Sequence, residues 1–508
     1  MSILYKISEY FSYLQGNSSR YKLAKLAGFA ICIILIALRY PPFILKPRLW
    51  AEENLYYELF FSAEKWWHGF DALIYPAYYV GLSRFAGFLA SLFDPIYAAV
   101  ITTYFGFFIL LIPFAIIFFG KCSYWNNLEK KAILSLILIF SCSTGEIWLN
   151  STNIHFILPI ITFLILIDDH TNNKLKTYFY SIFISFACIT GPISLLLSPL
   201  FLIRFIQKKE KEFFIYCLCF LIFGFFQVIF FAVSLSLGMV NENRGSAIDL
   251  DFFNQLYYLV SPNIIFPLFG YFISLIFRNF MISINSTDDW SNYILIIQEY
   301  LPVTLSNIFM SLLSVAQEFS FLLNLIFVFF FIYISFKIIV KSNLEEKLYF
   351  IFPFLYLCLV ANYFSLSGHG GFRYSFITGF ILLFFIFQKI YGKQKKSKTG
   401  VAQVLLIISI SVGVIEYYPR VISYTPETLS KGETWPLWSE EVKKWEEENK
   451  YNPVIWPHLS NNNGLWPDRD TIYKVNLNEP ESWNNQGKLR FSSEIKNFFT
   501  KSEEKNNK

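Results

Sequence analysis

The chain has 508 residues, of which 55% are hydrophobic and only 16% are charged, and its formal net charge is +5. Soluble domains carry about 25% charged residues, so the composition excludes a soluble globular protein and predicts an all-α, polytopic membrane protein. The Lys and Arg residues form short clusters between apolar runs, which is typical of membrane topology and excludes a nucleic-acid-binding surface. All seven Cys residues lie in or beside apolar runs, so we expect no disulfide framework and no zinc site.

Eleven apolar runs are long enough, or nearly long enough, to cross a bilayer. They lie near residues 26–42, 97–120, 132–149, 153–167, 177–191, 192–206, 213–237, 319–340, 348–364, 374–391 and 401–417. A transmembrane helix needs about 20 residues, so the shorter runs must extend into their flanks or lie within a bundle. Gly191-Pro192 predicts a break between two of the helices. We expect about 11 transmembrane helices in a membrane domain of residues 26–417, preceded by a cytoplasmic segment of residues 1–25.

Basic residues gather in alternate loops between these runs. One set of loops holds Arg20, Lys22, Lys25, Lys121, Lys130, Lys131, Lys174, Lys176, Lys208, Lys209, Lys211, Lys341, Lys347, Lys393, Lys395, Lys396 and Lys398. The short loops around 146–152 and 191–192 hold none. Because cytoplasmic loops carry an excess of Lys and Arg, we expect the first set of loops and the N-terminus to be cytoplasmic, and the C-terminus to be extracytoplasmic.

Two further apolar stretches, residues 72–93 and 257–277, are long enough either to span the membrane or to lie flat at its outer surface. Counting only one of them as a span would invert every later loop and break the charge pattern. We therefore expect both to be interfacial or re-entrant helices at the outer face. The outside then carries loops of about 43–96 and 238–318, a Trp-rich tail domain of residues 418–500, and a charged end, residues 501–508, predicted to be disordered.

The first outer loop contains an acidic pair ten residues beyond the first span. The segment PRLWAEENLYY holds Arg48, Glu52 and Glu53 among aromatic residues. A carboxylate at the membrane boundary is suited to act as a general base for a hydroxyl group. The alternative is that the acids belong to a solvated loop.

A second polar cluster lies at the outer end of the third span, in the segment GEIWLNSTNIHF. Glu146, Asn150 and Asn153 have the spacing i, i+4, i+7, so on a helix they share one face, with His155 close by. If the helix ends near Asn150, these residues form a polar turn instead. Capping of two helix ends would explain the Asn residues, but it does not explain Glu146 at membrane depth.

A third cluster, SGHGGFRY, is a short outer loop that contains His369, Arg373 and Tyr374. Its glycines allow a ligand to approach the backbone, and an Arg is able to hold a phosphate through two parallel hydrogen bonds. The alternative is an Arg that reaches lipid headgroups.

In the tail, three Trp-Pro pairs begin at Trp435, Trp456 and Trp466. They indicate either sugar stacking or the core of a small domain.

The segments PRLWAEENLYY, EIWLNSTNIHF, TGPISLLLSPLFLIR and GFRY resemble motifs of the multi-span GT-C glycosyltransferases of bacterial envelopes, in particular the O-antigen-modifying glucosyltransferases of the serotype-conversion type. The resemblance covers residues 26–417 and the outer tail. It implies a GT-C-like fold in the bacterial cytoplasmic (inner) membrane. Many members carry an Asp in the first-loop motif, whereas both acids here are Glu, so the choice between Glu52 and Glu53 as the base stays open.

The resemblance also implies a mechanism and partners. Glu52 or Glu53 would take the proton of an acceptor hydroxyl, and Arg373, or else Arg48, would neutralise a leaving polyprenyl phosphate in an inverting transfer. The partners would be a polyprenyl-phosphate-linked sugar donor, a glycan or lipid-linked acceptor such as O-antigen, the lipid bilayer, a lipid-linked-sugar synthase and a flippase. Some relatives use a divalent cation (Mg²⁺ or Mn²⁺), which Glu146 would help to hold, but the sequence does not require one.

Two other functions fit a multi-span protein. A polymerase or ligase of surface polysaccharide would use Arg-rich outer loops, yet the loop at 238–318 has only Arg244 and Arg278. A lipid or solute transporter would place its polar residues at mid-membrane, whereas the clusters here lie at the outer boundary. The sequence therefore favours the transferase.

Overall fold

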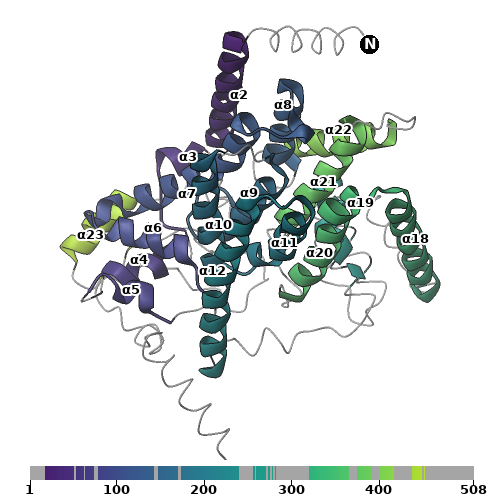
Figure 1. Cartoon of the computed structure of the whole chain (residues 1–508). Helices are drawn as coiled ribbons and strands as arrows, with labels where there is room; N and C mark the ends of the chain where they lie inside the picture. Colours follow the sequence, from purple (N-terminus) through teal and green to yellow (C-terminus); the bar gives the residue numbers. More distant parts are fainter. Residues whose placement is uncertain are drawn as a thin grey trace, which may run out of the picture. The chain divides into compact units, whose positions relative to one another are not determined.

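The structure is a computed structural model (Figure 1) that describes residues 18–39, 41–50, 53–61, 65–73, 78–141, 147–169, 173–238, 256–257, 259–270, 273–274, 320–364, 375–391, 400–416 and 437–448, with single residues at 63, 277, 281, 451 and 453. Most of these residues are helical, and none of them lies in a strand, in agreement with the expected all-α class. The chain divides into two compact units. One comprises Met1–Ile139, Ser143–Glu242 and Tyr417–Lys508, and the other comprises Phe140–Cys142 and Asn243–Glu416.

The first unit is a bundle of helices, and its most extensive contacts join helices that are two apart in the chain. Its described helices are α2 (Ser18–Arg39), α3 (Pro41–Leu45), α4 (Glu53–Phe61), α5 (His68–Asp71), α6 (Gly81–Ser91), α7 (Ala98–Phe119), α8 (Leu128–Leu136), α9 (Ile154–Ile167), α10 (Lys174–Ile189), α11 (Ser198–Lys208), α12 (Lys211–Ser236) and α23 (Trp438–Glu447). Helix α7 packs against α2, α6 and α9, while α12 packs against α10 and α11. Helices α4, α5 and α6 form a group of short helices in the segment predicted to be the first outer loop (Figure 1).

Several helices have the length and composition of membrane spans. Three described helices are long and apolar enough to cross a membrane: Ser19–Arg39, Pro95–Phe119 and Lys211–Ser236. Shorter apolar helices are Ile154–Ile167, Phe376–Tyr391 and Gly400–Ile415. On α12, the side chains of Leu221, Phe225 and Val228 are 68%, 64% and 61% exposed, respectively. Their spacing, i, i+4, i+7, makes one apolar stripe along the helix, as expected for a surface that faces lipid.

The predicted helix over residues 132–149 is wrong at its end. Helix α8 ends at Leu136, a π-helical turn continues it to Ser141, and residues 147–149 lie in a turn. Leu149 has a φ of +58°, which lies outside the right-handed helical region and is rare for a residue with a Cβ. The apolar run therefore contains two structures, a helix and the start of a polar turn.

The break predicted at Gly191-Pro192 is confirmed. Helix α10 ends at Ile189, Gly191 has a φ of +137°, and α11 begins at Ser198 after a 3₁₀ turn over Ser194–Leu197. Glycine tolerates this φ because it has no Cβ, and a proline cannot donate a backbone hydrogen bond to continue the helix.

The stretch at 72–93 contains α6, which is too short to cross a bilayer. Its 11 residues extend about 17 Å, whereas the hydrocarbon core is about 30 Å thick. Helix α6 packs closely on α4, because a Cβ on Gly87 would lie 2.6 Å from the carbonyl oxygen of Tyr56. The short length agrees with the expectation of an interfacial or re-entrant helix in so far as the segment does not span the membrane. The other ambiguous stretch, residues 257–277, is described only in part.

Charged side chains at one end of the first unit bind the C-terminal carbonyls of its helices. Lys131 donates to the carbonyl of Gly120 after α7 (3.0 Å), and Arg204 donates to the carbonyl of Asp168 after α9 (2.9 Å). The Lys176 ammonium lies 2.6 Å from the Asp168 carboxylate. Cations near helix C-termini are stabilising, because the dipole is negative there. The Lys residues in or beside the loops that follow α7, α9 and α11 therefore lie at the same end.

The second unit also consists of apolar helices. Its described helices are α18 (Ser320–Lys341), α19 (Leu344–Glu346), α20 (Phe352–Phe364), α21 (Phe376–Tyr391) and α22 (Gly400–Ile415). Helix α21 contacts both α20 and α22. The Thr378 hydroxyl of α21 donates to the Asn263 side chain (2.5 Å), and Lys389 pairs with Glu346 (2.6 Å). Such polar contacts hold apolar helices together where hydrophobic burial discriminates little between packing partners.

Candidate functional site

The acidic pair of the first outer loop lies at the start of α4, and its second member, Glu53, is buried (1% exposed). The Glu53 backbone N–H donates to the carbonyl of Trp50 (2.6 Å), and the Trp50 N–H donates to Glu53 Oε2 (2.7 Å). These reciprocal bonds close the turn that leads from the loop into the helix. The alternative of a solvated acid is therefore wrong for Glu53. Glu52 lies outside the described residues.

The Glu53 carboxylate joins the first outer loop to the second polar cluster, 98 residues away in the chain. Oε1 accepts from the Ser151 N–H (2.5 Å) and from the Ser151 hydroxyl (2.8 Å). Oε2 accepts from the Thr102 hydroxyl of α7 (3.4 Å), in addition to Trp50. A carboxylate has about four lone-pair sites, and donors of this protein occupy four. Glu53 thus holds three segments together.

Burial changes the acidity of this carboxyl group. It raises the pKa of Glu53 from 4.5 to about 7, although the hydrogen bonds from Trp50, Ser151 and Thr102 favour the ionised form and lower the pKa. Desolvation is the larger effect because no described cation pairs with the carboxylate. Glu53 therefore exchanges its proton close to neutral pH.

The second cluster is a polar turn, as in the second of the two alternatives. Asn150 Oδ1 accepts from the Asn153 N–H (2.8 Å), just before α9, and Asn150 Nδ2 donates to the carbonyl of Trp148 (3.2 Å). The Ser83 hydroxyl of α6 donates to the carbonyl of Ser151 (2.8 Å). Asn150 and Asn153 are each 2% exposed. Their amides shape the turn that carries Ser151. Glu146 lies outside the described residues.

Glycines bring neighbouring segments close to this turn. A Cβ on Gly106 of α7 would lie 2.7 Å from the carbonyl carbon of Asn150, and a Cβ on Gly191 would lie 3.2 Å from Cβ of His155. His155 is half-buried, and its Nδ1 lies 2.8 Å from the carbonyl oxygen of Thr152. His155 is thus held next to the turn but does not contact Glu53.

Replacing Gly106 with Ala is expected to displace the turn and to lower the unfolding temperature, because the new methyl group would meet backbone atoms that cannot rotate away. The matched control is Gly224→Ala in α12, where the methyl group would meet the end of the flexible Leu195 side chain. Thermal unfolding in neutral detergent measures both. Equal unfolding temperatures for the two variants would contradict the close contact at Asn150.

Two polar groups of the turn have no hydrogen-bond partner in the part of the chain that the structure describes: Trp148 Nε1 and the Thr152 hydroxyl. The Trp148 ring lies under the guanidinium of Arg39, 4.4 Å from its centroid, and Arg39 donates to the carbonyl of Ile139 (2.9 Å). Sequence reasoning missed Arg39. Its signal was a charged residue inside the outer end of an apolar run, a costly position that is often functional.

The tail helix α23 covers the start of the first outer loop. The Trp438 indole N–H donates to the carbonyl of Pro95 (2.9 Å), and its ring packs in a buried cluster with Leu49 and Tyr57. Trp438 is only 4% exposed, so it belongs to the core of this unit and not to a sugar-binding surface. Trp435, Trp456 and Trp466 lie outside the described residues.

Arg48 is directed toward this tail helix. It is 4% exposed, and burial lowers its pKa to about 10, whereas the carboxylate of Glu441 on α23 favours its charge. Arg48 is therefore protonated at neutral pH and already lies in the field of an acidic group. This placement makes Arg48 a poorer candidate for a phosphate ligand than the sequence alone suggested.

The third predicted cluster, with His369, Arg373 and Tyr374, lies outside the described residues. Among the residues that the structure describes, no three His, Cys, Asp or Glu side chains lie close enough to hold a metal ion. The described site consists of Glu53 and the polar turn around Ser151, and Arg39 and His155 lie at its edges. Comparison of the chain with protein-family models, with curated proteins and with solved structures found no match.

Proposed function

We propose that the protein is a membrane glycosyltransferase that moves a sugar from a polyprenyl-phosphate donor to an extracytoplasmic glycan acceptor. The observation that carries the proposal is the contact between Glu53 and Ser151, which joins the two polar clusters that resemble glycosyltransferase motifs. Helix capping needs only residues close in sequence, whereas this polar site joins distant segments at the ends of apolar helices. It is suited to chemistry at the membrane boundary.

Glu52 is the general base in this proposal, and Glu53 positions it. The oxygens of Glu53 are occupied by donors of the protein and its side chain is buried, so it has no free face for a substrate. Glu52 is the other carboxylate of the acidic pair, and it is the candidate that remains for the base. The bonds from Glu53 fix the loop that carries Glu52.

The transfer proceeds with inversion at the anomeric carbon. The Glu52 carboxylate accepts the proton of the acceptor hydroxyl, and the hydroxyl oxygen forms a bond to the anomeric carbon from the face opposite the phosphate. The bond from that carbon to the phosphate oxygen breaks, and the electron pair leaves with polyprenyl phosphate. Arg373 neutralises the phosphate through paired N–H donors, a role that suits it better than Arg48 beside Glu441.

The proposed orientation places this chemistry outside the cell membrane. The Lys-rich loops of the first unit meet at the end that contains Lys131, Asp168 and Arg204, whereas Glu53 and Ser151 lie at the other ends of α7 and α9. The positive-inside rule assigns the Lys-rich end to the cytoplasm. The site made by Glu53 and the turn around Ser151 then faces the outer leaflet of a bacterial inner membrane. A flippase delivers the lipid-linked sugar to this leaflet after its synthesis.

The test is a transfer assay with the purified protein in phospholipid vesicles. Polyprenyl-phosphate sugars labelled in the sugar, with glucose, galactose and mannose tested in turn, are supplied together with an O-antigen glycan. Transfer of label to the glycan, with no need for a nucleotide sugar, is the expected result. Movement of intact labelled lipid between leaflets without transfer would indicate a transporter, and label in a lengthened polymer of repeat units would indicate a polymerase; either result would overturn the proposal.

A further inference from the structure

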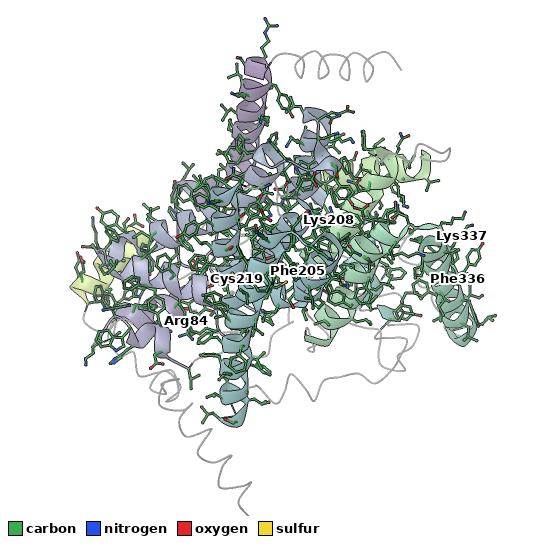
Figure 2. The ribbon with its side chains drawn as sticks, in the orientation of Figure 1. Arg84, Phe205, Lys208, Cys219, Phe336 and Lys337 are labelled. Carbon is green, nitrogen blue, oxygen red and sulfur yellow. The ribbon has the colours of Figure 1, made fainter. Side chains whose placement is uncertain are left out.

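Arg84 is a fully buried cation in the first turn of α6, with 0% of its side chain exposed. It lies between α5 and α12 (Figure 2). Its Nη1 donates to the carbonyls of Gly69 (2.8 Å) and Phe70 (3.2 Å). The guanidinium carbon lies 4.6 Å from the ring centroid of Tyr79. One nitrogen of the guanidinium is therefore used by the protein, and an aromatic ring covers the group.

The other two nitrogens of Arg84, Nε and Nη2, are buried and have no hydrogen-bond partner among the described residues. The Asp71 carboxylate favours the charge of Arg84 but forms no ion pair with it. A buried guanidinium with only one of its three nitrogens hydrogen-bonded costs free energy, and an apolar side chain of similar volume is often the more stable choice at such a position. The retention of an arginine here points to a ligand.

A second observation comes from α12, which faces the same aromatic ring. Gln227 Nε2 donates to the carbonyl of Tyr79 (3.1 Å), but Gln227 Oε1 has no hydrogen-bond partner in the described structure, and neither has the buried Ser234 hydroxyl. Gln227, Phe230 and Ser234 have the spacing i, i+3, i+7 and share one face of α12. Phe230 lies between the two polar residues and contacts both Tyr79 and Arg84.

The unused groups match one kind of ligand. Two adjacent N–H groups of a guanidinium suit a phosphate, which they bind through parallel hydrogen bonds. The positive end of the α6 dipole adds to the charge of Arg84, because the residue lies in the first turn of the helix. A free amide oxygen on Gln227 accepts from a hydroxyl group. Tyr79, whose ring contacts the guanidinium of Arg84, is 8% exposed.

We infer that Arg84 and Gln227 form a binding site for the head of a lipid that carries a phosphate ester and hydroxyl groups. Arg84 Nε and Nη2 bind the phosphate oxygens, and Gln227 Oε1 accepts a hydroxyl hydrogen. A lipid-linked sugar phosphate has this chemistry, and so has the headgroup of phosphatidylglycerol. Its assignment to the sugar donor rests on the proposed function. Ser83, next to Arg84, donates to the Ser151 carbonyl, so α6 connects this site with the candidate catalytic turn.

The inference is tested by ligand binding and does not depend on transfer. The unfolding temperature of the purified full chain in neutral detergent is measured while a polyprenyl-phosphate sugar, polyprenyl phosphate without a sugar, polyprenol without a phosphate, or phosphatidylglycerol is added. Polyprenyl phosphate is expected to raise the unfolding temperature, and polyprenol is not. Arg84→Gln is expected to raise the dissociation constant of polyprenyl phosphate about 10- to 100-fold, since a hydrogen bond to a charged group is lost. Arg84→Lys is expected to restore part of the binding.

Arg204→Gln is the matched control, because Arg204 is a buried arginine at the other end of the unit that donates to protein carbonyls. It is expected to lower the unfolding temperature without changing the dissociation constant. Equal binding by the parental protein and Arg84→Gln would overturn the site. Binding of phosphatidylglycerol but not of polyprenyl phosphate would support the lipid site and overturn its link to the donor. Arg84-dependent binding of polyprenyl phosphate without sugar transfer would support the site while the proposed transferase function failed.

Discussion

Glu52→Gln is expected to slow sugar transfer by about 10²- to 10⁴-fold, the usual loss when a general base is removed. Gln keeps the size and hydrogen bonding of the side chain but cannot take the proton of the acceptor hydroxyl. The unfolding temperature is expected to stay at the parental value, because the buried contacts of the loop are made by Glu53. The rate is measured in the vesicle assay as label transferred to the glycan at saturating acceptor.

Glu446→Gln is the matched control for this experiment, because Glu446 is an exposed acid on the tail helix α23. Its transfer rate is expected to equal the parental rate. A parental rate for Glu52→Gln as well would show that Glu52 is not the base, and the proposed mechanism would then lose its proton acceptor.

Glu53→Gln is expected to act on stability first. One oxygen of Glu53 faces the Ser151 N–H and the other faces the Trp50 N–H, so the amide NH₂ of a Gln in either orientation would face a backbone donor. A buried donor without an acceptor costs about 1–3 kcal/mol. We expect the free energy of unfolding at pH 5 to fall by about that amount, as measured by equilibrium unfolding in neutral detergent, with Glu52→Gln unchanged.

This loss is expected to shrink as the pH rises. The unfolded chain releases the Glu53 proton near pH 4.5, whereas the folded protein keeps it up to about pH 7. Between these values the folded state binds more protons, so the stability of the parental protein decreases with rising pH, by about 3 kcal/mol in all, and is constant above the window. Glu53→Gln has no such proton. A stability advantage of the parental protein over Glu53→Gln that grows from pH 4.5 to pH 7 would contradict the raised pKa.

The sequence predicted the parts of the fold that local chemistry determines. The break at Gly191-Pro192 followed from the backbone properties of glycine and proline. The polar residues Glu53, Asn150 and Asn153 stood out because they lie at the ends of apolar runs, and the structure brings these segments together. The helix predicted to reach residue 149 failed, because hydropathy does not show where the backbone leaves the helical region.

The contacts that depend on tertiary packing were not predictable. Nothing local marks Arg84 as a buried cation, since its burial comes from α5, Tyr79 and Phe230 together. Glu52 and Glu53 are neighbours of the same residue type, so the sequence does not tell them apart. Glu53 is identified by the hydrogen bonds that it accepts from Thr102 and Ser151, which are distant in the chain. The role proposed for Glu53 therefore depends on folded contacts that the sequence does not show.

The cations at the Lys-rich end serve two processes in the life of the protein. In the proposed orientation, Lys131 would help to retain its loop in the cytoplasm during insertion. In the folded bundle, the same ammonium group caps the carbonyls at the end of α7, as Arg204 does for α9. Correct insertion therefore delivers each charge to the helix end that it later stabilises. A span inserted backwards would lose the cap together with its orientation, which gives quality control in the membrane a folded-state defect to detect.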